Sequence, residues 1–266
     1  MIAYPIRPDQ LRALIQSHDS DWLAAAARGE GPDWGRIKAV FFDLQQHKCG
    51  YCERRLPERG RVEQDIEHFR PKRRVTSSPG GPGSGRSGGY GRLAYNPDNF
   101  LVACKTCNTS LKKTQFPIDG RPGRDVDDVP VLDGVERPLL INPVGPKCGS
   151  PRRVICFEGI LARPRTKGGR ARRQADAIIG IFELNSREEL LLGRFAVIWL
   201  TWLLFERRER QRGAEAKEAR TDLNRLKRGW SEHTACIRDY IDLCEADPVR
   251  AWEYFDCARR VVGFSN

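Results

Sequence analysis

Two Cys-x-x-Cys pairs bound the stretch around which the chain is organised, Cys49-Gly-Tyr-Cys52 and Cys104-Lys-Thr-Cys107-Asn108. Between them lies the sequence Asp65-Ile-Glu67-His68-Phe-Arg70-Pro-Lys72. Four thiolates at such spacing are typical of one tetrahedral zinc site without an open position, which stabilises a fold rather than catalyses a reaction. We therefore predict a structural Zn²⁺ held by Cys49, Cys52, Cys104 and Cys107. Redox-active or unmetallated thiols are the alternative.

The residues around the cysteine pairs predict two short strands and a helix. The run 62–69 can form a strand that presents Glu67 and His68 near its end, and 100–103 can form a second strand. A helix over 106–113 would place Asn108 and Lys112 on one face. Packed together, these elements would gather a carboxylate, an imidazole, an amide oxygen and an ammonium. Such groups suit phosphodiester hydrolysis, in which a neutral histidine deprotonates water near an oxygen-ligated cation.

Composition favours a soluble globular protein with a polyanionic partner. The 266 residues are 39% hydrophobic and 30% charged, and the formal net charge is +11. The start of the chain, Met1 to Arg7, has no apolar core of a secretory signal, and the most apolar run, 195–205, is too short to span a bilayer. We therefore expect a cytoplasmic protein without a membrane partner, whose cysteines are metal ligands or buried thiols rather than disulfides.

The chain is expected to be α+β and mostly helical, with the zinc-stabilised module embedded in it. Helices over 1–48 would pack on the module, which spans 49–116 and carries a glycine-rich loop insertion at 77–91. A proline-rich connector over 117–169 contains two β-prone runs, 139–141 and 154–157, which predict a small hairpin. The remainder, 170–266, is expected to be helical.

Capping signals predict where several helices begin. Asp9 is expected to cap a first helix, and Ser186-Arg-Glu-Glu189 predicts a helix from Arg187 to about Arg212. After Gly213 one charged helix is expected to reach about Cys244, and Asp247-Pro248 predicts the start of a last one. The aromatic stripe of the long helix predicts core packing rather than a docking surface; it consists of Trp199, Trp202 and Phe205.

The central stretch resembles the HNH endonucleases, which have a ββα-metal fold. The residues that carry the resemblance are the two cysteine pairs, Glu67-His68, Asn99, Asn108 and Lys112. It implies that His68 is the general base, that Glu67 and Asn108 bind the catalytic metal, and that Asn99 braces the loop between the strands. Glu67 replaces the usual Asp, and Asn108 stands where a His is common. Oxygen ligands favour Mg²⁺ or Mn²⁺ as the catalytic cation.

A narrower resemblance, from about residue 40 to 195, is to the nuclease subunit of Septu-type antiphage systems, also found beside some retrons. It rests on the phrases at 66–72, 93–100, 138–143 and 179–185. The resemblance implies DNA as substrate and an ABC/SMC-like ATPase subunit as partner, with a reverse transcriptase and its DNA product in retron versions.

Basic residues beside the predicted site are candidates for nucleic-acid contact. They are Arg70, Lys72, Arg73, Arg74, Lys112 and Lys113. Two other functions stay open at this point. One is a zinc-stabilised nucleic-acid-binding or assembly module without catalysis, which would not need Glu67, His68 and Asn108 together. The other is an HNH nuclease that acts on RNA.

Overall fold

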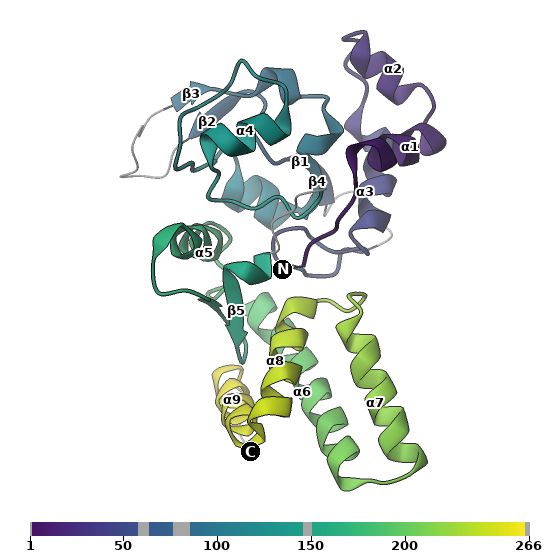
Figure 1. Cartoon of the computed structure of the whole chain (residues 1–266), viewed down its shortest axis with the longest axis vertical. Helices are drawn as coiled ribbons and strands as arrows, with labels where there is room; N and C mark the ends of the chain where they lie inside the picture. Colours follow the sequence, from purple (N-terminus) through teal and green to yellow (C-terminus); the bar gives the residue numbers. More distant parts are fainter. Residues whose placement is uncertain (1, 58–63, 77–85, 146–150, 264–266) are drawn as a thin grey trace.

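The computed structural model describes residues 2–57, 64–76, 86–145 and 151–263 (Figure 1). The first four helical segments and the strands β1–β4 lie in one part of the molecule, and α6–α9 form the other, with α5 and β5 between them. The strands pair in small two-stranded sheets. The expectation of a mostly helical α+β protein is therefore confirmed.

The N-terminal helices cover one side of the cysteine-bounded module. They are α1 (Pro8–His18), α2 (Trp22–Ala27), the 3-10 turn η1 (Trp34–Ile37) and α3 (Lys38–Leu44). The prediction that Asp9 caps the first helix is wrong, because Arg7 is the N-cap and Asp9 lies inside the first turn. Pro8 sets this start, since its fixed φ suits the first helical position. Phe41 of α3 packs edge-on against Phe100 in the core, at a centroid distance of 6.0 Å.

Two antiparallel strands followed by a helix form the centre of the module. Strand β1 (Gln64–His68) pairs with β4 (Phe100–Cys104), and His68 lies opposite Phe100. The helix η4 (Thr106–Lys112) follows directly and is wound as a π-helix. The predicted strands and the predicted helix are confirmed, although the π-winding differs from the expected α-helix. Every residue of β4 is buried, so this strand anchors the module in the main core.

The glycine-rich stretch is only partly the loop that the composition predicts. Residues 77–85 of the predicted insertion lie outside the described residues. The prediction is wrong for 86–88, because β3 (Arg86–Gly88) pairs with β2 (Arg74–Thr76). Gly89 approaches the other strand so closely that a Cβ there would lie 2.5 Å from the Arg73 carbonyl carbon. The 3-10 turns η2 (Gly91–Leu93) and η3 (Pro97–Asn99) then lead into β4.

The connector contains a helix and a hairpin. Asp128 caps α4 (Val129–Glu136) with a 2.9 Å hydrogen bond from the Val131 N–H, and the 3-10 turn η5 (Pro151–Arg153) precedes the hairpin. Strand β5 (Ile155–Glu158) pairs with β6 (Leu161–Pro164). The prediction that 139–141 supplies a strand is wrong. The hairpin closes locally instead, because Gly159 at φ +58° provides the left-handed turn between adjacent runs.

The C-terminal region is helical, as expected. Its helices are α5 (Gly169–Ile181), α6 (Glu188–Arg210), α7 (Ala214–Lys227), α8 (Thr234–Ala246) and α9 (Pro248–Val261). The single charged helix predicted after Gly213 is wrong, since Gly229 and His233 adopt positive φ and separate α7 from α8. The cap at Asp247 is confirmed by its 3.0 Å hydrogen bond from the Arg250 N–H.

The aromatic stripe of α6 packs mainly inward. Trp202 and Phe205 are buried in a cluster with Phe255 of α9, as predicted, whereas Trp199 is partly exposed. Among the described residues, no helix combines the length and the apolar character that crossing a membrane requires.

Candidate metal centre and catalytic site

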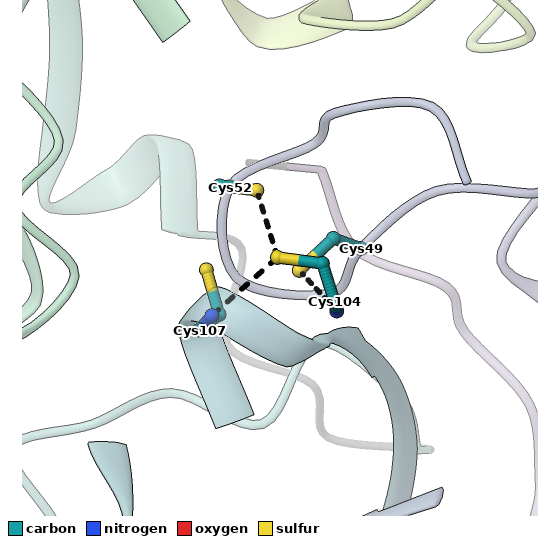
Figure 2. Close-up of side chains that lie close together, drawn as sticks. All are labelled: Cys49, Cys52, Cys104 and Cys107. Atoms are coloured by element: carbon teal, nitrogen blue, oxygen red, sulfur yellow. Dashed lines mark hydrogen bonds between the residues drawn. The ribbon is translucent and has the colours of Figure 1, made fainter. Parts of the chain in front are cut away.

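The four cysteines of the two pairs meet in one buried cluster (Figure 2). Cys49 and Cys52 come from the loop after α3, Cys104 ends β4, and Cys107 lies in the first turn of η4. Their sulfur atoms lie within 4.8 Å of one another, and the Sγ atoms of Cys52 and Cys104 are 4.0 Å apart. All four are free of disulfides. A tetrahedral Zn²⁺ with Zn–S bonds of about 2.3 Å requires sulfur separations of about 3.8 Å. The cluster therefore fits zinc.

Backbone groups already point at these sulfurs. The Cys104 N–H donates to Cys49 Sγ, and the Cys107 N–H donates to Cys104 Sγ, each at 3.4 Å. Gly50 lets the first knuckle turn against β4, because a Cβ there would lie 2.6 Å from Leu101 Cδ1. Sulfur contacts from Cys107, Cys49 and Cys52 hold the pKa of Cys104 far below its ordinary value. Burial and sulfur contacts raise the pKa of Cys49 and Cys107 instead, so the cluster favours one thiolate, and a bound metal ion would be needed to deprotonate the other thiols.

Glu67 and Lys112 form a buried ion pair next to the cysteine cluster. Lys112 Nζ lies 2.5 Å from Glu67 Oε1, and the side chains are 0% and 6% exposed. The same ammonium donates to the His68 carbonyl at 3.1 Å, and the Tyr51 hydroxyl donates to Glu67 Oε1 at 3.5 Å. Burial raises the pKa of Glu67, and Lys112 opposes that rise. The structure therefore brings Glu67 and Lys112 together through β1 and η4.

His68 faces the opposite side of β1, because successive strand residues alternate between faces. Its Nε2 lies 3.0 Å from the Ala94 carbonyl, which also accepts a 2.9 Å hydrogen bond from the Trp34 indole. A carbonyl only accepts, so Nε2 carries the hydrogen and Nδ1 holds the free lone pair. Burial lowers the pKa of His68 to about 4, which keeps the imidazole neutral near pH 7.

Aromatic rings fix the orientation of that imidazole. The His68 ring meets Phe100 and Trp34 edge-on, at centroid distances of 5.0 Å and 5.1 Å. Trp34 itself stacks on Tyr95 at 5.3 Å, and Lys72 Nζ lies 3.4 Å from the centroid of the Trp34 ring. Trp34 thus lies between the candidate base and a candidate phosphate contact. The sequence predicted only a packing role for it, since an apolar helix face carries no sign of a distant histidine.

Asn99 is fully buried and joins the segment after β1 to the start of β4. Its Oδ1 accepts from the Arg70 N–H at 2.8 Å, and its Nδ2 donates to the Arg70 carbonyl at 3.0 Å. The Phe69 N–H also donates to the Asn99 carbonyl at 2.8 Å. These bonds hold the end of β1, where His68 lies, against the end of η3.

The other predicted ligand of a catalytic cation is Asn108 of η4. No hydrogen bond joins its side chain to that of Glu67 in the described part of the chain. Asn108 is half-buried and lines a cleft of about 690 Å³ together with Trp34, Lys38 and Asp65. Asp65, which the sequence did not single out, forms a 2.6 Å ion pair with Lys105. A cation shared by Glu67 and Asn108 therefore stays a prediction.

Two of the predicted nucleic-acid contacts are buried instead. Arg70 is fully buried and pairs with Glu136 at 2.9 Å and Asp133 at 2.6 Å. Lys112 is likewise enclosed with Glu67. A phosphate cannot reach either side chain in this structure, so the expectation is corrected for both. The other members of the set remain accessible: Lys72 is half-buried, and Arg73, Arg74 and Lys113 are exposed.

Arg187 is a residue of the metal centre that the sequence did not indicate. It lies 80 positions after Cys107, and its Nη1 donates to Cys107 Sγ at 3.2 Å. Burial alone would lower its pKa, but the charge of Cys107 and Cys52 raises that pKa. The sequence predicted only a helix start at this position.

Comparison with known proteins finds two curated relatives. The Septu protein PtuB of Bacillus mycoides (strain KBAB4) is 38% identical over 111 residues, which is 40% of this chain and 34% of that protein. The Septu protein PtuB of Bacillus thuringiensis is 34% identical over 77 residues, which is 28% of this chain and 24% of that protein. The matches thus span about a third and about a quarter of the length of the two curated relatives. No protein-family model and no solved structure matches the chain. The similarity agrees with the Septu-type resemblance over part of the sequence.

Proposed function

We propose that this chain is a metal-dependent HNH-type endonuclease that hydrolyses DNA and serves as the effector nuclease of a Septu-type antiphage system. The observation that carries the proposal is the state of His68. It is a neutral, buried histidine whose tautomer is set by the Ala94 carbonyl, and it sits next to an acidic residue at the end of a strand that the cysteine cluster braces. The similarity to two Septu PtuB proteins supports the biological setting.

The chemistry assigned to His68 follows from its free nitrogen. With Nε2 donating to Ala94, Nδ1 can accept a proton from a water molecule that attacks the phosphorus in line. The contacts with Phe100 and Trp34 keep the ring from rotating away from that water. The Ala94 carbonyl stabilises the imidazolium that forms, in the way that an orienting acceptor does in other acid–base sites. The leaving group would be the 3′ oxygen, which gives 5′-phosphate and 3′-hydroxyl ends.

A divalent cation fits the chemistry of the proposed donors, Glu67 and Asn108, which are hard oxygens. When bound there, Mg²⁺ or Mn²⁺ would supply positive charge to the phosphoryl and leaving oxygens. Lys112 Nζ now lies 2.5 Å from Glu67 Oε1, so its ammonium competes with a cation for that oxygen. Lys72, Arg73, Arg74 and Lys113 remain the candidates for phosphate contact.

The partners of the proposed nuclease follow from the Septu-type resemblance. An ABC/SMC-like ATPase subunit is the expected partner, with a reverse transcriptase and its DNA in a retron setting. The formal charge of +11 supports contact with nucleic acid, but phosphate contact alone does not distinguish DNA from RNA.

The test compares the zinc-loaded wild type with His68→Ala and His18→Ala on supercoiled plasmid with Mn²⁺. His18 is exposed at the end of α1, so its variant controls for loss of a histidine. Loss of a general base should slow cleavage by about 100-fold or more, whereas His18→Ala should cut like the wild type. The nicks should be resealed by a DNA ligase without end repair.

An RNA of matched sequence, assayed in parallel, decides the substrate class. If the isolated chain is inactive, the same variants are assayed in complex with the proteins that co-purify with it. Equal cleavage by wild type and His68→Ala, at equal zinc content, would rule out the assignment.

A further inference from the structure

Arg187 connects the helical region to the cysteine cluster. It stands immediately before α6 and its guanidinium is 6% exposed. Nη1 donates to Cys107 Sγ at 3.2 Å and to the Phe182 carbonyl at 3.4 Å. The other edge of the fork pairs with Glu189 at 2.8 Å, but Glu189 is 44% exposed on its side chain. Cys107 is therefore a buried partner of the buried Arg187 guanidinium.

A zinc ion bound by four thiolates would make such a cation necessary. Four thiolates and Zn²⁺ carry a net charge of −2, and an isolated charge in a buried site is strongly disfavoured. The backbone N–H groups of Cys104 and Cys107, which donate to Cys49 Sγ and Cys104 Sγ, offset part of that charge. Arg187 is a cationic side chain that donates directly to a cysteine sulfur of the cluster.

A second contact joins the same two segments. The Tyr51 ring, between Cys49 and Cys52, stacks on Phe182 at a centroid distance of 4.2 Å and an interplanar angle of 18°. Phe182 follows α5 directly and its carbonyl accepts from Arg187. Both knuckles of the cluster thus contact the segment between α5 and α6, one through a ring and one through a charge.

We infer that Arg187 is a positioning residue of the zinc centre, which offsets the charge of the tetrathiolate and couples zinc retention to the docking of α6. Outer contacts of this kind change metal affinity even though they are not ligands. The coupling is reciprocal, so loss of zinc should loosen the start of α6 as much as loss of Arg187 loosens zinc. This inference requires that the cluster binds zinc, and it does not depend on nuclease activity.

The experiment uses the full chain, loaded with Zn²⁺, and three variants. Arg187→Met removes the charge and keeps the length, Arg187→Lys keeps the charge and loses the fork, and Glu189→Gln removes only the exposed partner. Zinc release to a chromophoric chelator should be about 10-fold faster or more in Arg187→Met, intermediate in Arg187→Lys, and unchanged in Glu189→Gln. With Co²⁺ in place of zinc, the thiolate-to-metal charge-transfer band should shift in Arg187→Met, which a purely structural role would not cause.

Hydrogen exchange supplies an independent measurement on the wild type. Removal of zinc should speed amide exchange in the segment 182–191 and leave the start of α9 unchanged. If Arg187→Met does not fold, the inference is tested by the zinc release rate of Arg187→Lys and by this exchange measurement. The inference would be overturned if Arg187→Met released zinc at the wild-type rate. It would also be overturned if Arg187→Lys did so and removal of zinc left amide exchange at 182–191 unaltered. A chain that binds neither Zn²⁺ nor Co²⁺ at the cluster would overturn it too.

Discussion

Replacing Lys112 by methionine should destabilise the folded chain by about 3 kcal/mol at pH 7. In the wild type the ammonium of Lys112 lies 2.5 Å from Glu67 Oε1, and both side chains are almost completely enclosed. Methionine keeps the length of the side chain but leaves the Glu67 carboxylate with the Tyr51 hydroxyl at 3.5 Å as its remaining side-chain donor. An unpaired buried charge of this kind typically costs about 3–5 kcal/mol.

Proton uptake by Glu67 limits that cost. A glutamate begins from an ordinary pKa of 4.5. Protonating it costs about 1.4 kcal/mol for each pH unit above that value, which gives about 3.4 kcal/mol at pH 7 and about 1.4 kcal/mol at pH 5.5. The variant should therefore lose about 2 kcal/mol less at pH 5.5 than at pH 7, since acid supplies the proton that replaces the ammonium.

Urea unfolding of zinc-loaded protein at pH 7 and pH 5.5 measures the loss of stability at each pH. Lys113→Met, an exposed neighbour, controls for loss of a positive charge, and Glu67→Gln/Lys112→Met removes both charges. The double variant should be more stable than Lys112→Met at pH 7. Millimolar Mn²⁺ should raise the stability of Lys112→Met but not of the double variant, because a cation can take the place of the ammonium on Glu67. Wild-type stability of Lys112→Met at both pH values, with no effect of Mn²⁺, would refute this reasoning.

Three further predictions concern the scaffold. Cys104→Ser should abolish stoichiometric zinc binding and the near-ultraviolet circular dichroism of the module, whereas Cys257→Ser, at an exposed cysteine, should leave both intact. Asp247→Ala should lower the free energy of unfolding by about 1 kcal/mol through loss of the α9 cap, with zinc content unchanged as the check on its locality. Burial and the nearby Arg194 lower the pKa of His233 to about 3. The unfolded chain therefore binds this proton first, and stability should fall as pH drops below 6.5, by up to about 1.4 kcal/mol per unit. His233→Asn, which accepts the left-handed backbone at that position, should show a shallower decline in urea titrations between pH 6.5 and 4.5.

Local signals predicted the features that depend on adjacent residues. The cysteine cluster was predictable because a knuckle fixes two thiols through three residues of chain, and the strands supply the remaining geometry. The cap at Asp247-Pro248 acts within one turn, so its sequence suffices. The break between α7 and α8 also has a local sequence signal, because Gly229 lies in it. The charged residues around Gly229 concealed that signal.

Contacts across the sequence were not predictable in the same way. Arg70 pairs with Glu136 and Asp133, which lie about 65 residues further along the chain. These partners depend on how α4 packs on the module. A run of basic residues after a strand looks solvated until that packing is known. Arg187 and Trp34 reach the site for the same reason: each belongs to a helical segment whose docking determines its role, and neither has a sequence spacing that relates it to Cys107 or His68.

The energetic cost of the polar site is an argument against a purely structural module. A scaffold built on four cysteines needs the two strands and the Asn99 bonds, and these already satisfy their own polar groups. It does not need a charge pair sealed between β1 and η4. Each buried ion loses several kcal/mol of hydration, and a well-packed apolar pair at such positions is often as stable or more so. The histidine beside the pair is a further buried polar group, whose Nε2 lies 3.0 Å from the Ala94 carbonyl. Charged and titratable side chains are therefore expected in a buried position mainly where a reaction requires them. Their presence here favours a nuclease over a zinc-stabilised binding module.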